Sequence, residues 1–245
     1  MHTTERQENI LSLLRQSNYL TVGELARCTF ASPSSIRRDL TFLENNGLVH
    51  RTHGGVTLPE AAAGVASFAN RKQKNTREKR LIARKAAGLL REGQTILLDG
   101  SSSVTYLLPH IAKFSGVRVY TNNLSTAIDA IELGISTNCV GGHSLKGSMV
   151  MTGPDTYRML LGLHADICFI SSKSLGADGT ISDPNQEENF IRQLMLRQSA
   201  QSVFLCDSSK FGRDSLYRLA SLDEVDVSIF DTPWDALTCR SNQML

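Results

Sequence analysis

Disulfide frameworks, zinc sites, signal peptides and membrane spans each require a pattern that this sequence lacks. The five cysteines are odd in number and scattered, with no CxxC pair among them. This usage argues against a disulfide framework or a zinc site and favours reduced thiols in a cytoplasm. The N-terminal segment has no apolar signal region, and no apolar run approaches the roughly 18 residues of a membrane span. We therefore expect a cytoplasmic protein with neither a bound metal nor a membrane partner.

A strong charge of one sign is also lacking. The 245 residues carry a net charge of only +2, which by itself indicates no partner. Hydrophobic residues make up 41% and charged residues 20% of the chain, proportions typical of a packed globular protein. The length suits one large domain, or a small domain followed by a larger one.

The composition changes near Thr57, which favours two domains. The segment TLPEAAAGVASFAN (57–70) is rich in Ala and Gly and contains Pro59, as linkers often are. From about Arg77 onward, helical and strand patterns alternate. We expect a small domain at 1–57, a linker at 58–76 and a larger domain at 77–245.

The segment SPSSIRRDL (32–40) has the pattern of a capped helix. Ser32 suits the N-cap, and Pro33 suits the first helical position because its missing N–H and fixed φ cost nothing there. Ile36, Leu40 and Leu43 recur at helical spacing and are expected to face a core. The side chains left to face outward are those of Ser34, Ser35, Arg37 and Arg38.

The segments on either side of this helix complete a motif. RQENILSLLRQ has an apolar helical stripe, and TVGELARC begins with Thr21 and Glu24 at the spacing of a capping box. LVHRTHGGV (48–56) has the pattern of a hairpin. Helix, short helix, turn, capped helix and hairpin in this order are typical of a winged helix-turn-helix, whose recognition helix enters the DNA major groove.

Two adjacent arginines also have a simpler explanation, because most such pairs lie on a solvated helix face. The cap, the preceding helix and the hairpin favour DNA instead, since arginine can bond guanine O6 and N7 and small hydroxyls can reach phosphate or base edges. Hairpin residues would lie alongside the DNA backbone or would only pack the hairpin. The predicted DNA contacts are Ser34, Ser35, Arg37, Arg38, Arg51 and His53.

In the second domain, short apolar runs predict six strands, at 95–99, 117–121, 136–142, 166–171, 202–207 and 225–231. Helical patterns between them favour a mostly parallel sheet covered on both faces. Ligands bind such sheets at the carboxyl ends of the strands. The basic segment RKQKNTREKRLIARK (71–85) is either a DNA-facing strip or a helix with a solvated face.

Polar residues follow several of these strands. DGSSS (99–103) could bind phosphate through backbone N–H groups and hydroxyls, or could simply form a tight turn and a helix cap. It is neither GxGxxG nor a Walker loop, so no nucleotide cofactor is expected. TNNLS (121–125) could bond a sugar or form a turn, Glu188 could reach a ligand or cap its helix, and Lys210 suits an anionic oxygen. The candidate ligand residues are Asp99, Gly100, Ser101, Ser102, Thr121, Asn122, Glu188 and Lys210.

Ordered motifs from both domains resemble the DeoR family of bacterial regulators, which are mostly repressors of sugar metabolism. These motifs are ERQENIL, ELA, SxxSIRRDL, LExxGLV and RTHGGV, then REKRLIARKAA, DGSSS, TNNL, ADICFI, GADG and DSSKFG. The resemblance implies an α/β fold class: an N-terminal winged helix-turn-helix and a larger domain similar in fold to ribose-5-phosphate isomerase and glucosamine-6-phosphate deaminase. It also implies that a phosphorylated sugar binds at the candidate residues and alters DNA binding.

Three places depart from the pattern of the family. Ser171, Ser172 and Lys173 stand where the family is usually glycine-rich, and Phe190 stands where many members have a polar or acidic residue. The turn TFA (29–31) stands where the family usually has a Gly or Val. The first two departures bear on which effector is bound, and the third bears on the shape of the turn.

Two functions of different classes fit these residues. The first is a regulator without enzymatic activity, a repressor of a carbohydrate-utilisation operon that binds its DNA operator as a homodimer or homotetramer and responds to a phosphorylated sugar. The second is a sugar-phosphate isomerase or deaminase with an accessory DNA-binding domain, in which Glu188 and Lys210 serve as acid and base. No pair of catalytic carboxylates stands out, so we predict the repressor. An activator that uses the same parts is a third, weaker hypothesis.

Overall fold

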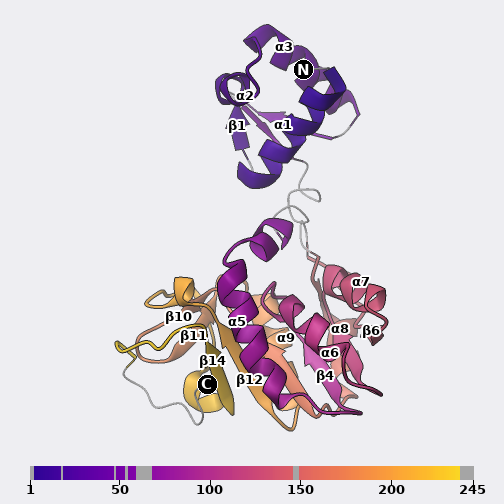
Figure 1. The fold of residues 1–245 in the computed structure, drawn as a ribbon, viewed down its shortest axis with the longest axis vertical. Helices are drawn as coiled ribbons and strands as arrows, with labels where there is room; N and C mark the ends of the chain where they lie inside the picture. The colour runs from indigo at the N-terminus through magenta and orange to yellow at the C-terminus, as the bar shows by residue number, and fades with distance from the viewer. Residues whose placement is uncertain are drawn as a thin grey trace. The chain divides into compact units, whose positions relative to one another are not determined.

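The computed structural model describes residues 3–17, 19–46, 48–52, 55–58, 68–145 and 149–237. The chain divides into two compact units, one comprising Met1–Gln73 and the other comprising Lys74–Leu145 and Met149–Leu245 (Figure 1). Residues 59–67 of the expected linker lie outside the described residues, and the expected domain limits stay a prediction. None of the described helices combines the length and apolar character needed to cross a membrane.

The first unit is a winged helix-turn-helix, as predicted. Its helices are α1 (Thr3–Ser17), α2 (Val22–Cys28) and α3 (Pro33–Asn45). Its strands are β1 (Tyr19–Thr21), β2 (His50–Thr52) and β3 (Gly55–Thr57), which form one antiparallel sheet in the order β1-β3-β2. The hairpin β2–β3 was expected, whereas β1 was not, because three residues are too few to show a strand periodicity. The core comprises Ile10, Leu14, Leu25, Ile36, Leu40, Leu43, Val49, Val56 and Leu58.

The second unit is built on a six-stranded parallel sheet in the order β14-β12-β9-β4-β5-β6. The strands are β4 (Thr95–Leu98), β5 (Arg118–Thr121), β6 (Ser136–Cys139), β9 (Ile167–Ile170), β12 (Ser202–Cys206) and β14 (Val227–Phe230). Each lies within one of the six predicted runs, so the predicted α/β class is confirmed.

Helices cover both faces of this sheet (Figure 1). They are α5 (Thr76–Ala86), α6 (Leu108–Ile111), α7 (Leu124–Glu132), α8 (Pro154–Leu161) and α9 (Gln186–Arg197), with short 3-10 turns at η1 (Ala87–Leu89), η2 (Val104–Leu107), η3 (Ser208–Lys210) and η4 (Leu222–Glu224). Along β4, Ile96 and Leu98 pack with Ile82 of α5, whereas Leu97 packs with Ile191 of α9. Alternate residues of one strand thus enter two cores, which is why the strands read as continuous apolar runs.

Two smaller sheets complete the second unit, and neither was predicted. β10 (Ser174–Leu175), β11 (Thr180–Asp183) and β13 (Tyr217–Ser221) pair antiparallel, while β7 (His143–Ser144) pairs with β8 (Met151–Thr152). Strands of two to five residues carry little periodic signal, so their pairing depends on contacts between distant segments.

Candidate DNA-binding and effector sites

Helix α3 begins as its sequence predicts. Ser32 is the N-cap, its Oγ accepts a hydrogen bond of 3.2 Å from the N–H of Ser35, and Pro33 occupies the first helical position. Ile36, Leu40 and Leu43 are buried. Of the predicted DNA contacts on this helix, Ser34, Arg37 and Arg38 are exposed and Ser35 is half-buried.

Asp39 of α3 departs from its exposed neighbours and was not singled out by the sequence. It is 2% exposed, and its carboxylate accepts hydrogen bonds from Arg6 and Gln7 of α1. The side-chain hydrogen bond from Arg6 to Asp39 raises the pKa of Arg6. This pair fixes α3 against α1, so it sets the orientation in which α3 presents its exposed side chains.

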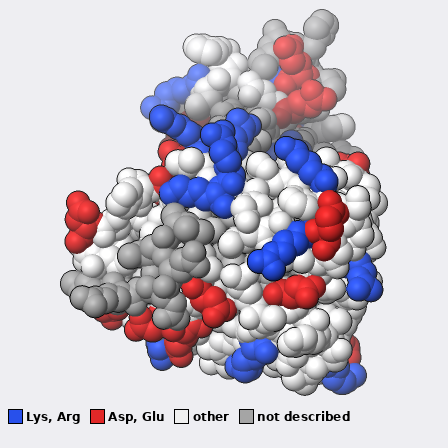
Figure 2. All heavy atoms as spheres, turned by 60° about the horizontal axis from the view of Figure 1, so that its bottom comes forward, with Lys and Arg blue, Asp and Glu red and all other residues white. Residues whose placement is uncertain are grey.

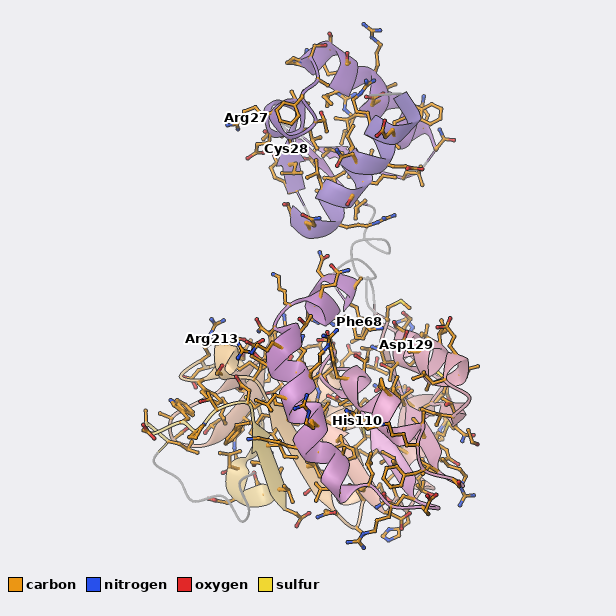
Figure 3. All side chains as sticks on the ribbon, in the orientation of Figure 1. Arg27, Cys28, Phe68, His110, Asp129 and Arg213 are labelled. Carbon is orange, nitrogen blue, oxygen red and sulfur yellow. The ribbon has the colours of Figure 1, made fainter. Side chains whose placement is uncertain are left out.

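The hairpin holds one predicted DNA contact within the described residues. Arg51 lies on β2 and is exposed, and its backbone N–H donates to Glu44 Oε1 of α3 at 3.2 Å. That bond ties the hairpin to the recognition helix. His53 lies outside the described residues. On helix α2, Arg27 and Cys28 are exposed, and Figure 3 shows the Arg27 side chain at the outer side of that helix.

In the second unit, Asp99 lies at the carboxyl end of β4 and is fully buried. Its Oδ1 accepts from the N–H of Ser101 at 3.1 Å, and its Oδ2 accepts from the N–H of Ser171 at 3.3 Å. Oδ2 also accepts from Arg192 Nε at 2.8 Å. Asp99 therefore joins the ends of β4 and β9 to α9.

Arg192 is the main residue that sequence reasoning missed. It is 4% exposed, and its guanidinium pairs with Asp99 at 2.8 Å, with Glu188 at 2.8 Å and with Asp183 at 3.3 Å. Burial lowers the pKa of Arg192, but the carboxylates of Glu188, Asp99 and Asp183 more than offset this and raise it overall. The spacing of Glu188 and Arg192, four residues apart on one helix, was the only signal in the sequence. Through Arg192 the structure links two predicted residues, Asp99 and Glu188.

Two lysines converge on the serines that follow β4. Lys79 Nζ donates to Ser102 Oγ at 3.2 Å, and Lys210 Nζ donates to Ser103 Oγ at 3.5 Å. Lys210 also donates to Ser171 Oγ at 2.8 Å and pairs with a carboxylate oxygen of Asp207 at 3.3 Å. Lys210 was predicted, but Lys79 was assigned only to the basic segment.

The cations of that basic segment have different environments, and the choice between its two interpretations stays open. Lys79 is 4% exposed and contacts Ser102, whereas Lys74, Arg77, Arg80 and Arg84 are exposed. Helix α5 thus buries Lys79 beside the strand ends and leaves Arg77, Arg80 and Arg84 in solvent. Lys85 of the same helix is half-buried, and its Nζ donates to the Phe230 carbonyl at 2.9 Å. On the face shown in Figure 2, several Lys and Arg side chains gather in one group, and the Asp and Glu side chains lie mostly elsewhere on that face.

The remaining predicted residues lie at the ends of β4 and β5. Asn123 Nδ2 donates to the Gly100 carbonyl at 3.2 Å, and Thr121 Oγ1 accepts from the Asn123 N–H at 3.2 Å. Asn122 Nδ2 donates to the Met151 carbonyl at 2.9 Å. Among the described residues, Asn122 Oδ1 and Ser101 Oγ are buried polar atoms without a hydrogen-bond partner, as groups awaiting a ligand or water would be.

The sequence suggested Gly100 only as part of a phosphate-binding turn. The structure shows that the absence of a side chain at Gly100 also allows close packing. A Cβ atom built at Gly100 would lie 2.7 Å from Val150 Cγ2, closer than real Cβ contacts allow. Glycine therefore lets the segment before β8 lie against the loop after β4. That segment is also bonded to the end of β5, because the Met151 N–H donates to the Asn122 carbonyl at 2.7 Å.

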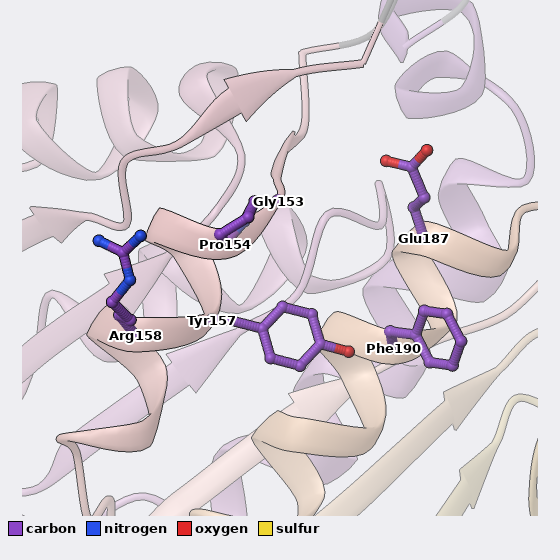
Figure 4. Close-up of a pocket in the computed structure, with 6 residues that line it drawn as sticks. All are labelled: Gly153, Pro154, Tyr157, Arg158, Glu187 and Phe190. Carbon is purple, nitrogen blue, oxygen red and sulfur yellow. The ribbon is translucent and has the colours of Figure 1, made fainter.

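A hollow of about 490 Å³ lies between the N-terminal ends of α8 and α9 (Figure 4). Its volume is in the range of small-molecule sites. Thr152 Oγ1 donates to Glu187 Oε2 at 3.0 Å beside it. None of its lining residues was a predicted contact; they are Gly153, Pro154, Tyr157, Arg158, Glu187 and Phe190.

These two units together define a class of protein. A winged helix-turn-helix with an exposed basic recognition helix, linked to an α/β unit with cations and hydroxyls at its strand ends, is the architecture of a DNA-binding transcriptional regulator. Residues 6–62 match the DeoR-like helix-turn-helix domain, and residues 74–232 match the DeoR C terminal sensor domain. The chain therefore belongs to the DeoR family, as its motifs predicted.

Similar proteins agree with this assignment. The HTH-type transcriptional regulator GolR of Listeria innocua is 34% identical over 94% of this chain and 91% of its own length. The glycerol-3-phosphate regulon repressor of Escherichia coli is 27% identical over 95% of this chain and 92% of its own. Both are transcriptional regulators, which supports regulation as the function of this chain.

Two solved structures align with this chain, and the first of them has a related fold. The delta subunit of eIF2B from Chaetomium thermophilum aligns with a TM-score of 0.50 at 17% identity and covers 71% of this chain and 63% of that one. Ribose 5-phosphate isomerase from Plasmodium falciparum aligns with a TM-score of 0.40 at 20% identity and covers 54% of this chain and 52% of that one. At these identities the likeness concerns the fold alone.

Proposed function

We propose that this regulator is a cytoplasmic repressor of a carbohydrate-utilisation operon and that a phosphorylated sugar modulates its binding to the operator. The observation that carries the proposal is the convergence of Lys79 and Lys210 on Ser102 and Ser103, directly after β4. Ammonium groups and hydroxyls gathered directly after a strand together favour a phosphate.

The groups around this phosphate position suit the rest of a sugar. The unpartnered Oδ1 of Asn122 and Oγ of Ser101 could bond sugar hydroxyls, and both lie within the network that joins the strand ends. The name of the Escherichia coli relative, a repressor of a glycerol-3-phosphate regulon, supports a phosphorylated polyol or sugar as the class of effector. The effector residues we propose are Asp99, Gly100, Ser101, Ser102, Thr121, Asn122, Glu188 and Lys210, with Lys79 added.

On the DNA side, we infer that α3 lies in the major groove and that the exposed side chains of its first turns read base edges. Arg37 and Arg38 are the proposed base contacts, while Arg51 and His53 are proposed to touch the backbone. A homodimer or homotetramer would present two such helices to spaced half-sites. An effector would lower operator affinity by binding better to an arrangement of the protein that fits the two half-sites less well.

The experiment is a thermal-shift screen of the full chain against phosphorylated sugars, each paired with its unphosphorylated parent. A ligand that binds the native state raises stability by RT ln(1 + [L]/Kd), about 2.7 kcal/mol at 100 times Kd. We expect a shift with at least one phosphorylated sugar and none with its parent. Stabilisation by parent sugars alone would contradict a phosphate site at Lys79 and Lys210.

The enzyme alternative is less well supported by the geometry. Glu188 pairs with Arg192, and Lys210 pairs with Asp207, so both proposed acid–base groups are held in ion pairs. Turnover of ribose-5-phosphate or glucosamine-6-phosphate that is lost in Glu188→Gln would favour the enzyme instead.

A further inference from the structure

Phe30 combines two properties that are each unusual for an apolar residue. Its backbone φ angle is 52°, in the left-handed region that bulky side chains rarely occupy. It is 97% exposed, more than any other large hydrophobic residue in the described part of the chain. Packing within the first unit accounts for neither property.

The backbone conformation has a local cause at the end of α2. The N–H of Ala31 donates to the carbonyl of Ala26 at 3.0 Å, and the N–H of Phe30 donates to the carbonyl of Arg27 at 3.4 Å. This pair of bonds is a Schellman motif, which requires a left-handed residue at the position of Phe30. Glycine is the usual residue there because it has no Cβ, and a polar side chain would suit the exposure. The turn therefore requires the backbone conformation but not the phenyl ring.

The position of the ring relative to α3 indicates what it serves. Phe30 precedes the N-cap Ser32 by two residues, and the first turns of a recognition helix are the part that meets the base edges. Ser34 and Arg37 nearby are exposed, and the first turn of α3 carries no acidic residue. The charged residues from position 27 to position 38 are all arginines, which suits a DNA partner.

A phenyl ring cannot donate or accept ordinary hydrogen bonds, so it reads no donor or acceptor of a base edge. Its contribution to sequence readout is apolar contact with the C5-methyl group of thymine, which only thymine presents in the major groove. We propose that Phe30 is a specificity-determining residue that contacts a thymine methyl at the edge of each operator half-site. The proposal rests on the placement of α3 in the major groove.

The test uses the full chain and a duplex selected by the wild-type protein from a random-sequence library. Each thymine of the duplex is replaced in turn by deoxyuridine, which removes only the methyl group. We expect one position in each half-site at which the wild type loses about threefold to fivefold in affinity, the effect of one buried methyl group. Phe30→Ala should lose a similar factor on the thymine duplex and should be insensitive to deoxyuridine at that position.

Two further variants separate readout from structure. Phe30→Gly should weaken operator binding while hydrogen-exchange protection of α2 and α3 stays at or above the wild-type level, because glycine suits the left-handed position. Phe42→Ala removes a second phenyl of the same unit, 53% exposed, and should keep the wild-type response to deoxyuridine.

Three outcomes would overturn the proposal. These are unchanged affinity in Phe30→Ala, equal deoxyuridine sensitivity in Phe30→Ala and the wild type, and loss of protection and affinity together in Phe30→Gly. Equal deoxyuridine sensitivity is expected if the ring packs only on deoxyribose, because removal of the thymine methyl would then not affect its contact. If α3 does not lie in the major groove at all, Arg37→Ala and Arg38→Ala should also leave operator affinity unchanged. That result distinguishes failure of the proposed function from failure of the Phe30 proposal alone.

Discussion

Neighbouring residues of α3 have opposite environments. Arg37 and Arg38 are exposed, whereas Asp39, the next residue along the helix, is buried and pairs with Arg6. The buried pair holds the helix in place and leaves the exposed pair available to a partner.

Arg37→Ala and Arg38→Ala should each weaken operator binding by about 1–3 kcal/mol if the arginine reads a base, and should relax specificity at one position. An arginine that touches only phosphate should weaken binding to all sequences alike and reduce the salt dependence. Arg91→Ala, at an exposed arginine of the second unit, is the matched control. The measurement is an operator titration at several salt concentrations. Unchanged affinity in both variants would refute the placement of α3.

Arg192 forms ion pairs with three carboxylates near the ends of the parallel strands. Its single positive charge faces three carboxylates, and its removal would take the guanidinium away from the buried carboxylates of Asp99 and Asp183. Leaving a buried charge uncompensated costs far more than losing an exposed pair.

Arg192→Met should therefore lower the free energy of unfolding of the second unit by about 3–5 kcal/mol. The chain has one tryptophan, Trp234, which stacks on Phe211 at 4.6 Å, so its fluorescence in urea reports this unit. Arg197→Met, at an exposed arginine of the same helix, should leave the free energy nearly unchanged. A similar loss in both variants would mean that the ion pairs of Arg192 contribute nothing specific.

At the scale of elements, the start of α3 matters for both stability and binding. The cap at Ser32 satisfies one of the free N–H groups of the first turn and thereby orders the residues that precede Arg37.

Ser32→Ala should destabilise the start of α3 by about 0.5–2 kcal/mol, and Ser32→Asp should restore it because aspartate is also a good N-cap. Hydrogen–deuterium exchange of the peptide that covers α3 measures the change in the full chain. Ser34→Ala, which leaves the cap in place, is the control. Equal exchange in Ser32→Ala and the wild type would show that the Ser32 cap does not stabilise the start of α3.

The turn after β12 contains a carboxyl, Asp207, whose pKa differs from that of a free aspartate. Burial raises the pKa of Asp207, but Lys210, together with hydrogen bonds from Ser209 and Asn75, outweighs this and lowers it. A carboxyl whose pKa is lower in the folded state stabilises the fold above its unfolded pKa, about 3.9 for aspartate. That stabilisation is lost as the pH falls through the lower, folded value.

Asp207→Asn should be less stable than the wild type at pH 7, and the difference should shrink as the pH falls below about 4. Urea titrations followed by Trp234 fluorescence across this range measure it. Asp155→Asn, at an exposed aspartate, is the control for loss of a carboxylate at the surface of the same unit. A difference between Asp207→Asn and the wild type that stays constant with pH would contradict the linkage.

For the whole molecule, repression that responds to an effector requires two sites whose occupancies are coupled. The proposed effector residues all lie in the second unit, and the proposed DNA contacts all lie in the first. A coupling free energy between two sites acts equally in both directions.

If the phosphorylated sugar lowers operator affinity by some factor, the operator should lower sugar affinity by the same factor, in the range of about 5–150-fold. Calorimetric titration of the sugar with and without saturating operator tests this equality. Lys210→Met should remove sugar binding while it leaves operator affinity at the level of the sugar-free wild type. Equal sugar affinity with and without saturating operator would show that the two sites are not coupled.

Local signals in the sequence were enough to predict much of the fold. The cap at Ser32, the apolar spacing of Ile36 and Leu40 and the six apolar runs each depend on residues close together in the chain. Strand ends could be located for the same reason, and so could Asp99 and Lys210, which follow β4 and β12. The family motifs then added the order of the parts.

Only the tertiary structure decided which charged residues are buried and which remain exposed. Lys79 and Arg80 are adjacent and similar in chemistry, yet only Lys79 is buried, beside Ser102. Arg192 meets Asp99 across 93 positions of the sequence. Burial of this kind depends on contacts between segments far apart in the chain, whereas periodicity, caps and turns depend on nearest neighbours. For that reason the sequence by itself determined the elements and the class of protein, and the packing of those elements determined the network that joins the strand ends.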